Sequence, residues 1–278
     1  MSLFVFFAVL GAALLHAGWN AIIKTGGNKQ TTMMIFTVWQ GLIGLLALMW
    51  FPLPTPEVWP WLIASGVIHM FYQLFLAYAY EQGDLSRVYP ISRGSAPLIV
   101  LVVGAVLLDD IVTPVEYLGV AVLGLGIVTM ASGAFSSGEN RKLIPYALGA
   151  ACATAGYTLV DGIGARINGN PFAYVGWILF MSGIFFIPAA FALKGWSVAV
   201  APWAVWRRGI IPAGASLAAY AIVVWAMTQA PIALVAALRE TSILFAVLIG
   251  WLAFGEKMNV TKALAALLIV CGVILTRI

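Results

Sequence analysis

Residues 230–254 read APIALVAALRETSILFAVLIGWLAF, an aliphatic run that a short polar patch interrupts. At about 1.5 Å per residue, such a run is long enough to cross a bilayer core of about 30 Å as a helix. Arg239 and Glu240 lie roughly eight residues into it, on the order of 12 Å from its start. A charge at that depth costs at least about 2.5–3.5 kcal/mol unless it faces a partner or a wet cavity. The stretch therefore predicts a transmembrane helix whose charged side chains serve a site inside the protein.

A further arginine occupies a similar depth in the first half of the chain. Arg93 lies in residues 87–97, which run on into the apolar residues 98–108. Two arginines at membrane depth, on helices in corresponding positions, indicate a binding site. The alternative is an internal salt bridge that only locks the packing of the helices.

The composition is typical of a helical membrane protein with several spans. Of the 278 residues, 63% are hydrophobic and 9% are charged, and the mean hydropathy is +1.03. Soluble domains carry about 25% charged residues, so this composition excludes a soluble protein with an apolar core. The net charge of +4 comes from a few residues between the apolar runs. Because they form no basic stripe, we expect no nucleic-acid partner.

The sequence indicates neither a disulfide framework nor a metal site. Cys152 and Cys271 both fall inside apolar segments, and no metal-ligand spacing accompanies them. We therefore expect no cofactor and no metal. The first residues, MSLFVFFAVL, lack a positively charged n-region and continue into a full-length apolar run. This pattern predicts a first transmembrane helix and not a cleaved signal peptide.

Apolar runs of membrane length recur along the whole chain, separated by Pro, Gly and the few charges. They predict an all-α polytopic membrane protein, because each run is long enough for one bilayer crossing. We expect about ten transmembrane helices, near residues 3–24, 31–51, 58–81, 85–108, 114–134, 143–165, 171–193, 207–229, 231–253 and 260–277.

The second half of the sequence repeats the first. Residues 11–19 (GAALLHAGW) align with residues 149–157 (GAACATAGY), at an offset of 138. Further on, residues 79–82 (AYEQ) align with residues 226–229 (AMTQ), at an offset of 147. The offset changes little between these points, so the order of the elements is kept.

This repeat predicts two units within one membrane domain, residues 1–138 and residues 139–278. Each unit holds five of the expected helices, an odd number, so the two units must insert in opposite directions. Inverted repeats of this kind are how many transporters form two access states around one central site. We therefore expect two five-helix inverted repeats around a central cavity.

The motifs resemble those of a known family. The GAA…AG-aromatic pattern of the first helix and the acidic turns at 109–110 (DD) and 255–257 (GEK) resemble the EamA-type members of the drug/metabolite transporter superfamily. The resemblance covers essentially the whole chain. It implies ten helices in two inverted repeats and transport of amino acids, nucleotide sugars, phosphates or other small metabolites. It also implies a cavity lined mainly by the helices near 3–24, 58–81, 85–108, 143–165, 207–229 and 231–253.

Polar and aromatic residues gather on those same helices. Polar groups at membrane depth should face the bundle interior, because hydrocarbon cannot hydrogen-bond them. A lone histidine in a membrane helix is, alternatively, often only hydrogen-bonded to a neighbouring helix. The candidate substrate-binding residues are His16, Trp19, Asn20, His69, Tyr72, Gln73, Tyr89, Arg93, Tyr157, Asp161, Tyr220, Arg239 and Glu240.

The charges among these candidates suggest a substrate class. Arg93 and Arg239 suit an anionic group such as a carboxylate, held by charge-assisted hydrogen bonds. Glu240 and Asp161 could receive an ammonium group, and the aromatic residues could attract it by cation–π contact. Together these suit an amino-acid-like zwitterion. If Arg239 pairs with Glu240 or Asp161 instead, a neutral or cationic compound becomes plausible.

The predicted function is secondary transport of a small-molecule substrate across the lipid bilayer. We expect an exporter of amino-acid-like zwitterions, working by alternating access in a bacterial-type inner membrane as a monomer or homodimer. The alternative is a broad multidrug exporter that binds lipophilic cations in the same cavity, with the arginines dispensable. An intramembrane enzyme would use His16, His69 and Asp161. No nucleophile or metal motif accompanies these residues, so we do not expect an enzyme.

Overall fold

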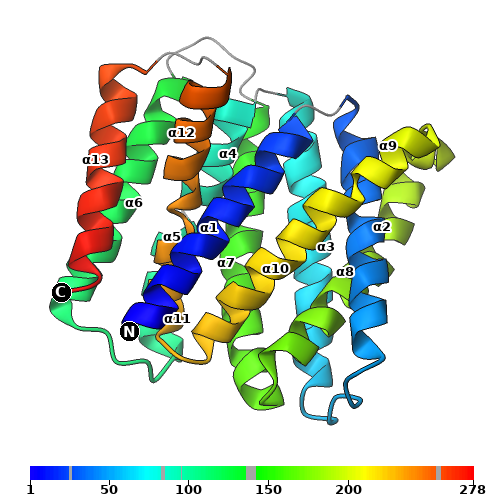
Figure 1. The fold of residues 1–278 in the computed structure, drawn as a ribbon, viewed down its shortest axis with the longest axis horizontal. Coiled ribbons are helices and arrows are strands. Elements are labelled where there is room, and N and C mark those ends of the chain that lie inside the picture. The colour runs from blue at the N-terminus through cyan, green and yellow to red at the C-terminus, as the bar shows by residue number, and fades with distance from the viewer. Residues whose placement is uncertain (25–26, 83–84, 95, 136–141, 255–257) are drawn as a thin grey trace.

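The computed structural model describes residues 1–24, 27–82, 85–94, 96–135, 142–254 and 258–278, and within these ranges it contains helices and no strand (Figure 1). The first half of the chain forms α1 (Leu3–Lys24), α2 (Lys29–Leu48), α3 (Trp59–Gln82), α4 (Leu85–Gly94), α5 (Ala96–Leu107) and α6 (Pro114–Phe135). The second half forms α7 (Leu143–Asn168), α8 (Pro171–Lys194), η1 (Trp196–Ala199), α9 (Trp203–Arg208), α10 (Ile210–Met227), α11 (Ile232–Arg239), α12 (Ser242–Phe254) and α13 (Val260–Leu275).

Many of these helices are long and apolar enough to cross a membrane. Among the described residues, seven spans meet both criteria: Leu3–Ile22, Lys29–Leu48, Trp59–Gln82, Leu143–Asn168, Pro171–Lys194, Trp203–Met227 and Ile232–Leu252. Three shorter apolar helices are Ile91–Leu107, Pro114–Met130 and Val260–Leu275. All ten lie where the sequence predicts a span, although the count of ten crossings stays a prediction. The boundary predicted between residues 138 and 139 lies outside the described residues.

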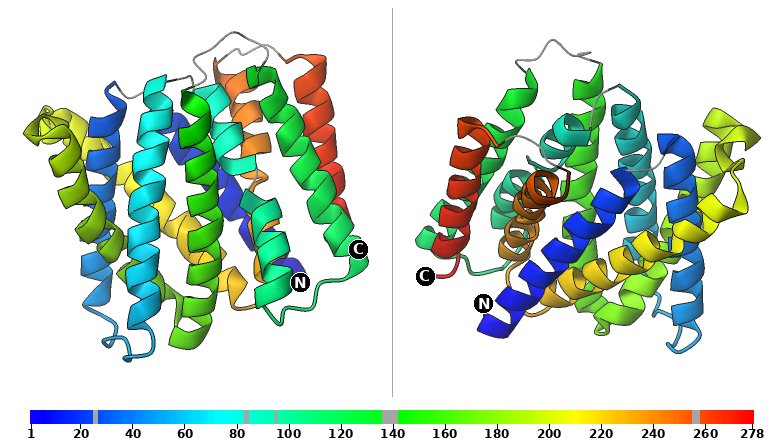
Figure 2. Two further views of the ribbon diagram at one scale, coloured as in Figure 1. Left: turned by 180° about the vertical axis from the view of Figure 1, so that it is seen from behind. Right: turned by 45° about the horizontal axis from the view of Figure 1, so that its top comes forward.

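Helices at matching places in the two halves run in opposite directions. α1 begins at the edge of the bundle where both chain ends lie, whereas α7 begins at the opposite edge (Figures 1 and 2). We call the first edge, at the bottom of Figure 1, the terminal edge, and the other the far edge. The same reversal relates α6, which ends at the far edge, to α13, which begins there.

α6 and α13 pack against each other with their backbones in close approach. A Cβ atom added at Gly126 would lie 2.9 Å from the carbonyl oxygen of Ala265. One added at Gly272 would lie 2.5 Å from the backbone nitrogen of Leu123. Only glycine fits at these positions, as is common where membrane helices pack through small residues.

The span predicted over 85–108 is described as α4 and α5, and residue 95 between them lies outside the described residues. Pro97 is the second residue of α5.

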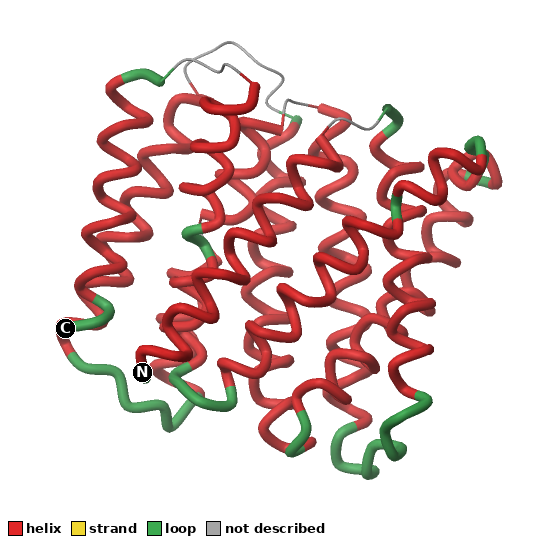
Figure 3. Tube along the Cα trace, in the orientation of Figure 1, coloured by secondary structure: helices red, strands yellow, loops and turns green. Residues whose placement is uncertain are grey.

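The span predicted over 231–253 is present as Ile232–Leu252, but it is divided into two helices where one was expected. α11 ends at Arg239 and α12 begins at Ser242, and Figure 3 shows the short segment between them at mid-height. The Thr241 amide donates to the Leu238 carbonyl at 3.1 Å, and the Thr241 hydroxyl donates to the same oxygen at 2.7 Å. The threonine hydroxyl thus competes with the regular helical bond and helps to end α11.

Candidate functional site

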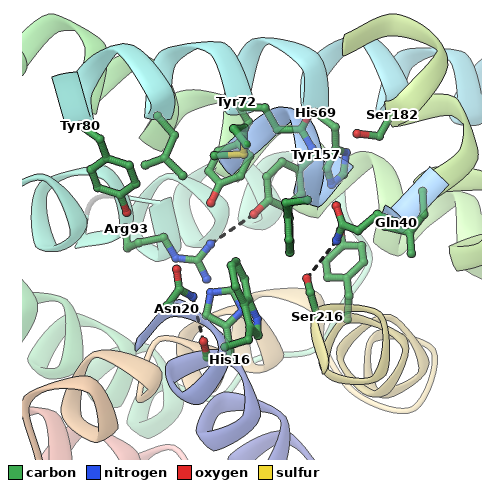
Figure 4. A pocket seen from close by; sticks show the side chains of 17 residues that line it. His16, Asn20, Gln40, His69, Tyr72, Tyr80, Arg93, Tyr157, Ser182 and Ser216 are labelled. Carbon is green, nitrogen blue, oxygen red and sulfur yellow. Dashed lines mark hydrogen bonds between the residues drawn. The ribbon is translucent and has the colours of Figure 1, made fainter. Parts of the chain in front are cut away.

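A pocket of about 80 Å³ lies among α1, α2, α3, α4, α7, α8 and α10 (Figure 4). Most of its wall is polar or aromatic, which is unusual for a space enclosed by apolar helices. It is lined by His16, Trp19, Asn20, Met33, Phe36, Gln40, His69, Tyr72, Gln73, Leu76, Tyr80, Arg93, Tyr157, Leu179, Ser182, Ser216 and Tyr220.

A smaller cavity of about 30 Å³ shares part of this wall. His16, Arg93, Tyr157 and Tyr220 line both spaces. The smaller cavity is further lined by Arg239, which does not line the larger pocket.

Glu240 joins the two arginines. Its Oε2 atom accepts from Arg93 Nε at 3.1 Å, and its Oε1 atom accepts from Arg239 Nη2 at 3.1 Å. None of the three side chains is more than 4% exposed. One carboxylate is therefore shared by two guanidinium groups, and the triad keeps one net positive charge. Removing one partner from such a buried group typically costs about 3–5 kcal/mol.

The arginines also contact α7. Arg93 Nη1 donates to the Tyr157 hydroxyl at 3.3 Å, and Arg239 Nη2 donates to the Thr158 hydroxyl at 3.4 Å. Arg239 also lies in the last turn of α11. The partial negative charge at a helix C-terminus favours a cation there, so the end of α11 suits Arg239.

A second polar cluster surrounds Asp161 on α7. The Tyr220 hydroxyl donates to Asp161 Oδ2, and His69 Nε2 lies 3.9 Å from the same oxygen. His69 Nδ1 lies 3.0 Å from the Ser65 carbonyl oxygen, which can only accept, so Nδ1 carries the donated proton. A neutral His69 then presents the lone pair of Nε2 toward the carboxylate.

Tyr157 stands between the two clusters. Its ring stacks on His69 with a centroid distance of 4.2 Å, and Tyr72 and Tyr220 approach it edge-on at 5.5 and 6.1 Å. The Arg239 Cζ atom lies 5.9 Å from the Tyr157 ring centroid, within cation–π range. Tyr157 therefore contacts both the arginine side and the aspartate side of the pocket.

The structure brings most of the sequence-predicted residues together. Asp161 and Glu240 line neither space but bond to residues that do, and Arg239 lines the smaller cavity. The side chain of Tyr89 lies outside the described part of the structure. Those that line the larger pocket are His16, Trp19, Asn20, His69, Tyr72, Gln73, Arg93, Tyr157 and Tyr220.

The sequence reasoning missed the contribution of α2 and α8. The resemblance implied a cavity lined mainly by six other helices, yet Gln40 of α2 and Ser182 of α8 both line the pocket. Gln40 Nε2 donates to the Ser216 hydroxyl at 3.0 Å. The available signal was a buried amide in an otherwise apolar helix, which needs a partner inside the bundle.

Comparisons with known proteins agree with the two-unit architecture. The model of the EamA-like transporter family matches residues 3–132 and again residues 141–278. No curated protein matches the chain. One similar solved structure, titled only "Crystal structure of protein", has a TM-score of 0.75 and 19% sequence identity, covering 99% of this chain and 98% of the other. That likeness shows a shared fold.

Proposed function

This chain belongs to the EamA-like transporter family, and we propose that it exports small amino-acid-like zwitterions by alternating access. The family match over both halves makes the chain a multi-pass membrane transporter of the drug/metabolite type. The proposal adds a substrate class, a direction and a bacterial-type inner membrane, with His16, Trp19, Asn20 and the other predicted residues forming the binding site. The direction and the membrane rest on the family resemblance alone.

The shared carboxylate of Glu240 is the observation that carries the proposed substrate class. Arg93 lines the pocket, and it shares the negative charge of the Glu240 carboxylate with Arg239. The triad can therefore accept one more negative group without leaving an excess of anions. A substrate carboxylate would form charge-assisted hydrogen bonds to these guanidinium groups.

The Asp161 cluster supplies the complementary position for an ammonium group. The 3.9 Å between His69 Nε2 and Asp161 Oδ2 is too long for a direct hydrogen bond. An ammonium group carries three donors and could bond the lone pair of His69 and an oxygen of Asp161 together. The faces of Tyr72 and Tyr157 add apolar and cation–π contact for the rest of the substrate.

A lipophilic cation is the second candidate, because Arg239 pairs with Glu240, the condition under which the sequence makes a neutral or cationic compound plausible. The two arginines are formally balanced by Glu240 and Asp161, so an added cation would give the site a net positive charge no larger than one. Tyr157 and Tyr220 contact His69, and Tyr72 contacts Tyr157, so the three tyrosines form an aromatic wall of the kind that binds organic cations. In this case substitution of Arg93 would leave binding intact.

A matched ligand set separates the two candidates in purified protein. L-phenylalanine, phenethylamine and 3-phenylpropionate share one ring and differ in their charged groups, and tetraphenylphosphonium is a purely lipophilic cation. We expect isothermal titration to detect L-phenylalanine alone, and Arg93→Gln to weaken its binding by at least about tenfold. The exposed Arg208 provides the control, because Arg208→Gln should leave the affinity unchanged.

The opposite pattern of binding would reject the zwitterion. Tetraphenylphosphonium that binds equally well to the wild type and Arg93→Gln, but not to Asp161→Asn, would support the cation transporter instead.

A further inference from the structure

At the terminal edge of the bundle, an ion pair and a set of hydrogen bonds join several segments of the chain, apart from the pocket. Arg166 Nη1 donates to Asp110 Oδ1 at 2.8 Å, and Arg166 Nη2 donates to Asp110 Oδ2 at 3.2 Å. Arg166 also donates to the carbonyl oxygens of Met227 and Ala230, at 2.9 and 3.1 Å. We call Asp110, Arg166 and these two carbonyl groups the clasp.

The clasp joins the two repeats. Asp110 follows α5 in the first half, whereas Arg166 lies in the last turn of α7 in the second half. The two carbonyl groups belong to the end of α10 and the turn before α11. The clasp thus ties three segments that an opening of the terminal edge would have to separate.

Asp110 also holds the start of a half-helix. Its Oδ2 atom accepts from the backbone N–H of Ile232, the first residue of α11. α11 has eight residues and ends at Arg239, directly before Glu240. At about 1.5 Å per residue it is a rod of roughly 12 Å between the clasp and the arginine–glutamate triad. All eight of its residues are at most 5% exposed, so the rod is packed along its whole length.

The pocket lies on the other side of this packed layer. On α1 its lining runs from His16 to Asn20, and on α3 from His69 to Tyr80, toward the ends of both helices at the far edge. The structure therefore combines a pocket that extends toward the far edge with a fastened terminal edge.

We propose that Asp110 and Arg166 are positioning residues that hold the terminal edge of the site closed, and that α11 links their state to the triad. This inference rests on the proposed alternating-access function. A movement of Arg239 and Glu240 around a substrate would shift α11 along its axis. This shift would break the hydrogen bond from the Ile232 N–H to Asp110. Because the linkage is reciprocal, releasing the clasp should also shift the site toward access from the terminal edge.

Two reporter cysteines on one face of α10 test the proposal. Ser216 lines the pocket, and the fully buried Met227 lies eleven residues further along, about 16 Å toward the terminal edge. Ser216→Cys and Met227→Cys are placed separately in a Cys152→Ser/Cys271→Ser background, because both native cysteines are exposed. The rate of labelling by a charged maleimide is then measured in purified full-length protein.

We expect Asp110→Asn and Arg166→Gln each to raise labelling at position 227 by about tenfold and to lower it at position 216. A general loosening of the fold would raise the labelling rates at both positions. Unchanged rates at both positions would mean that the clasp does not hold the terminal edge closed. Either result overturns the proposal. Arg166→Lys keeps the charge but loses the forked geometry, so its rates should lie between those of Arg166→Gln and the parent.

A matched control is the Glu81–Lys194 pair, which also joins the two halves but at the far edge. Its Nζ–Oε1 distance is 3.1 Å and its side chains are about as exposed as Arg166. Lys194→Gln should leave labelling at position 227 unchanged, and a rise equal to that of Arg166→Gln would overturn the specific role of the clasp. Labelling needs no substrate, so failure of zwitterion binding and failure of this inference are distinguishable.

Discussion

Corresponding positions in the two halves of the chain hold side chains of opposite charge. Arg93 lies in the last turn of α4 in the first half, and Glu240 directly follows α11 in the second half. These residues are 147 positions apart, the offset that also relates residues 79–82 to residues 226–229. Positions that correspond in the two repeats therefore hold an arginine and a glutamate, and these two side chains bond to each other.

The difference shows how a duplicated fold can join its halves. If both positions held arginine, two like charges would meet in a buried space, at high cost. With opposite charges, the same geometry forms an ion pair across the boundary between the repeats. Buried ion pairs contribute little net stability, but breaking one leaves an uncompensated charge. Loss of one partner is therefore expected to cost more than the pair contributes to the stability of the intact protein.

The largest expected effect comes from removing the shared carboxylate. Glu240→Gln removes the buried carboxylate that Arg93 and Arg239 share, and should destabilise the protein by about 3–5 kcal/mol. Thermal unfolding in detergent measures this loss. Glu57→Gln, at an exposed position, is the control. A Glu240→Gln variant as stable as this control would show that the charge of Glu240 does not join the two halves.

Exchanging the charges at positions 93 and 240 tests whether these two side chains pair directly. Arg93→Glu alone places two carboxylates together, and adding Glu240→Arg restores an opposite-charge pair. We expect the double variant to be more stable than the two single variants predict, by about 1–3 kcal/mol in a double-mutant cycle. Purely additive effects would contradict a direct pairing of positions 93 and 240.

A neutral pair in the same pocket sharpens the contrast with the charged one. Ser216→Ala removes the acceptor of the Gln40 amide and should cost about 1–2 kcal/mol. Gln40→Leu combined with Ser216→Ala removes both polar groups and should recover most of that loss. Unfolding of the single and double variants measures whether removing one polar partner costs more stability than removing both. A double variant less stable than either single variant would argue against this expectation.

The smallest effect is expected at the surface pair between the halves. Lys194 and Glu81 are about 31% and 32% exposed, so water and salt screen their attraction. Lys194→Gln should change stability by about 0.2–1 kcal/mol, and the difference should shrink as salt is added. A loss of stability as large as that of Glu240→Gln would mean that the difference in burial does not explain the difference between the exposed and the buried ion pair.

Much of the fold was accessible from the sequence because a bilayer imposes long apolar spans. The positions of the spans and the concentration of polar residues on certain helices follow from that constraint, and the repeat was visible in the alignment of residues 11–19 with residues 149–157. The break at residues 240–241 was not predictable, because it depends on a threonine hydroxyl bonding a carbonyl group, which many threonines do without ending a helix.

The candidate site was predictable in its charges and less so in its walls. Burial of Arg93 and Arg239 required a partner, and Glu240 was the adjacent choice. Which partner each arginine takes depends on the rotation of α4 against α11, and the sequence does not specify this. The role of Gln40 was missed for the same reason, since nothing in α2 alone indicates that it faces Ser216.

The glycine-lined contact between α6 and α13 has a mechanical consequence. A Cβ atom added at Gly126 or Gly272 would meet the side chain of Ile269 or Leu123 as well as backbone atoms, so this contact is tightly packed and has little room to change. Under alternating access this seam would be the stationary axis, and the movement would grow with distance from it. A covalent staple across the seam should therefore spare turnover, whereas one placed at the opposite flank of the bundle should arrest it.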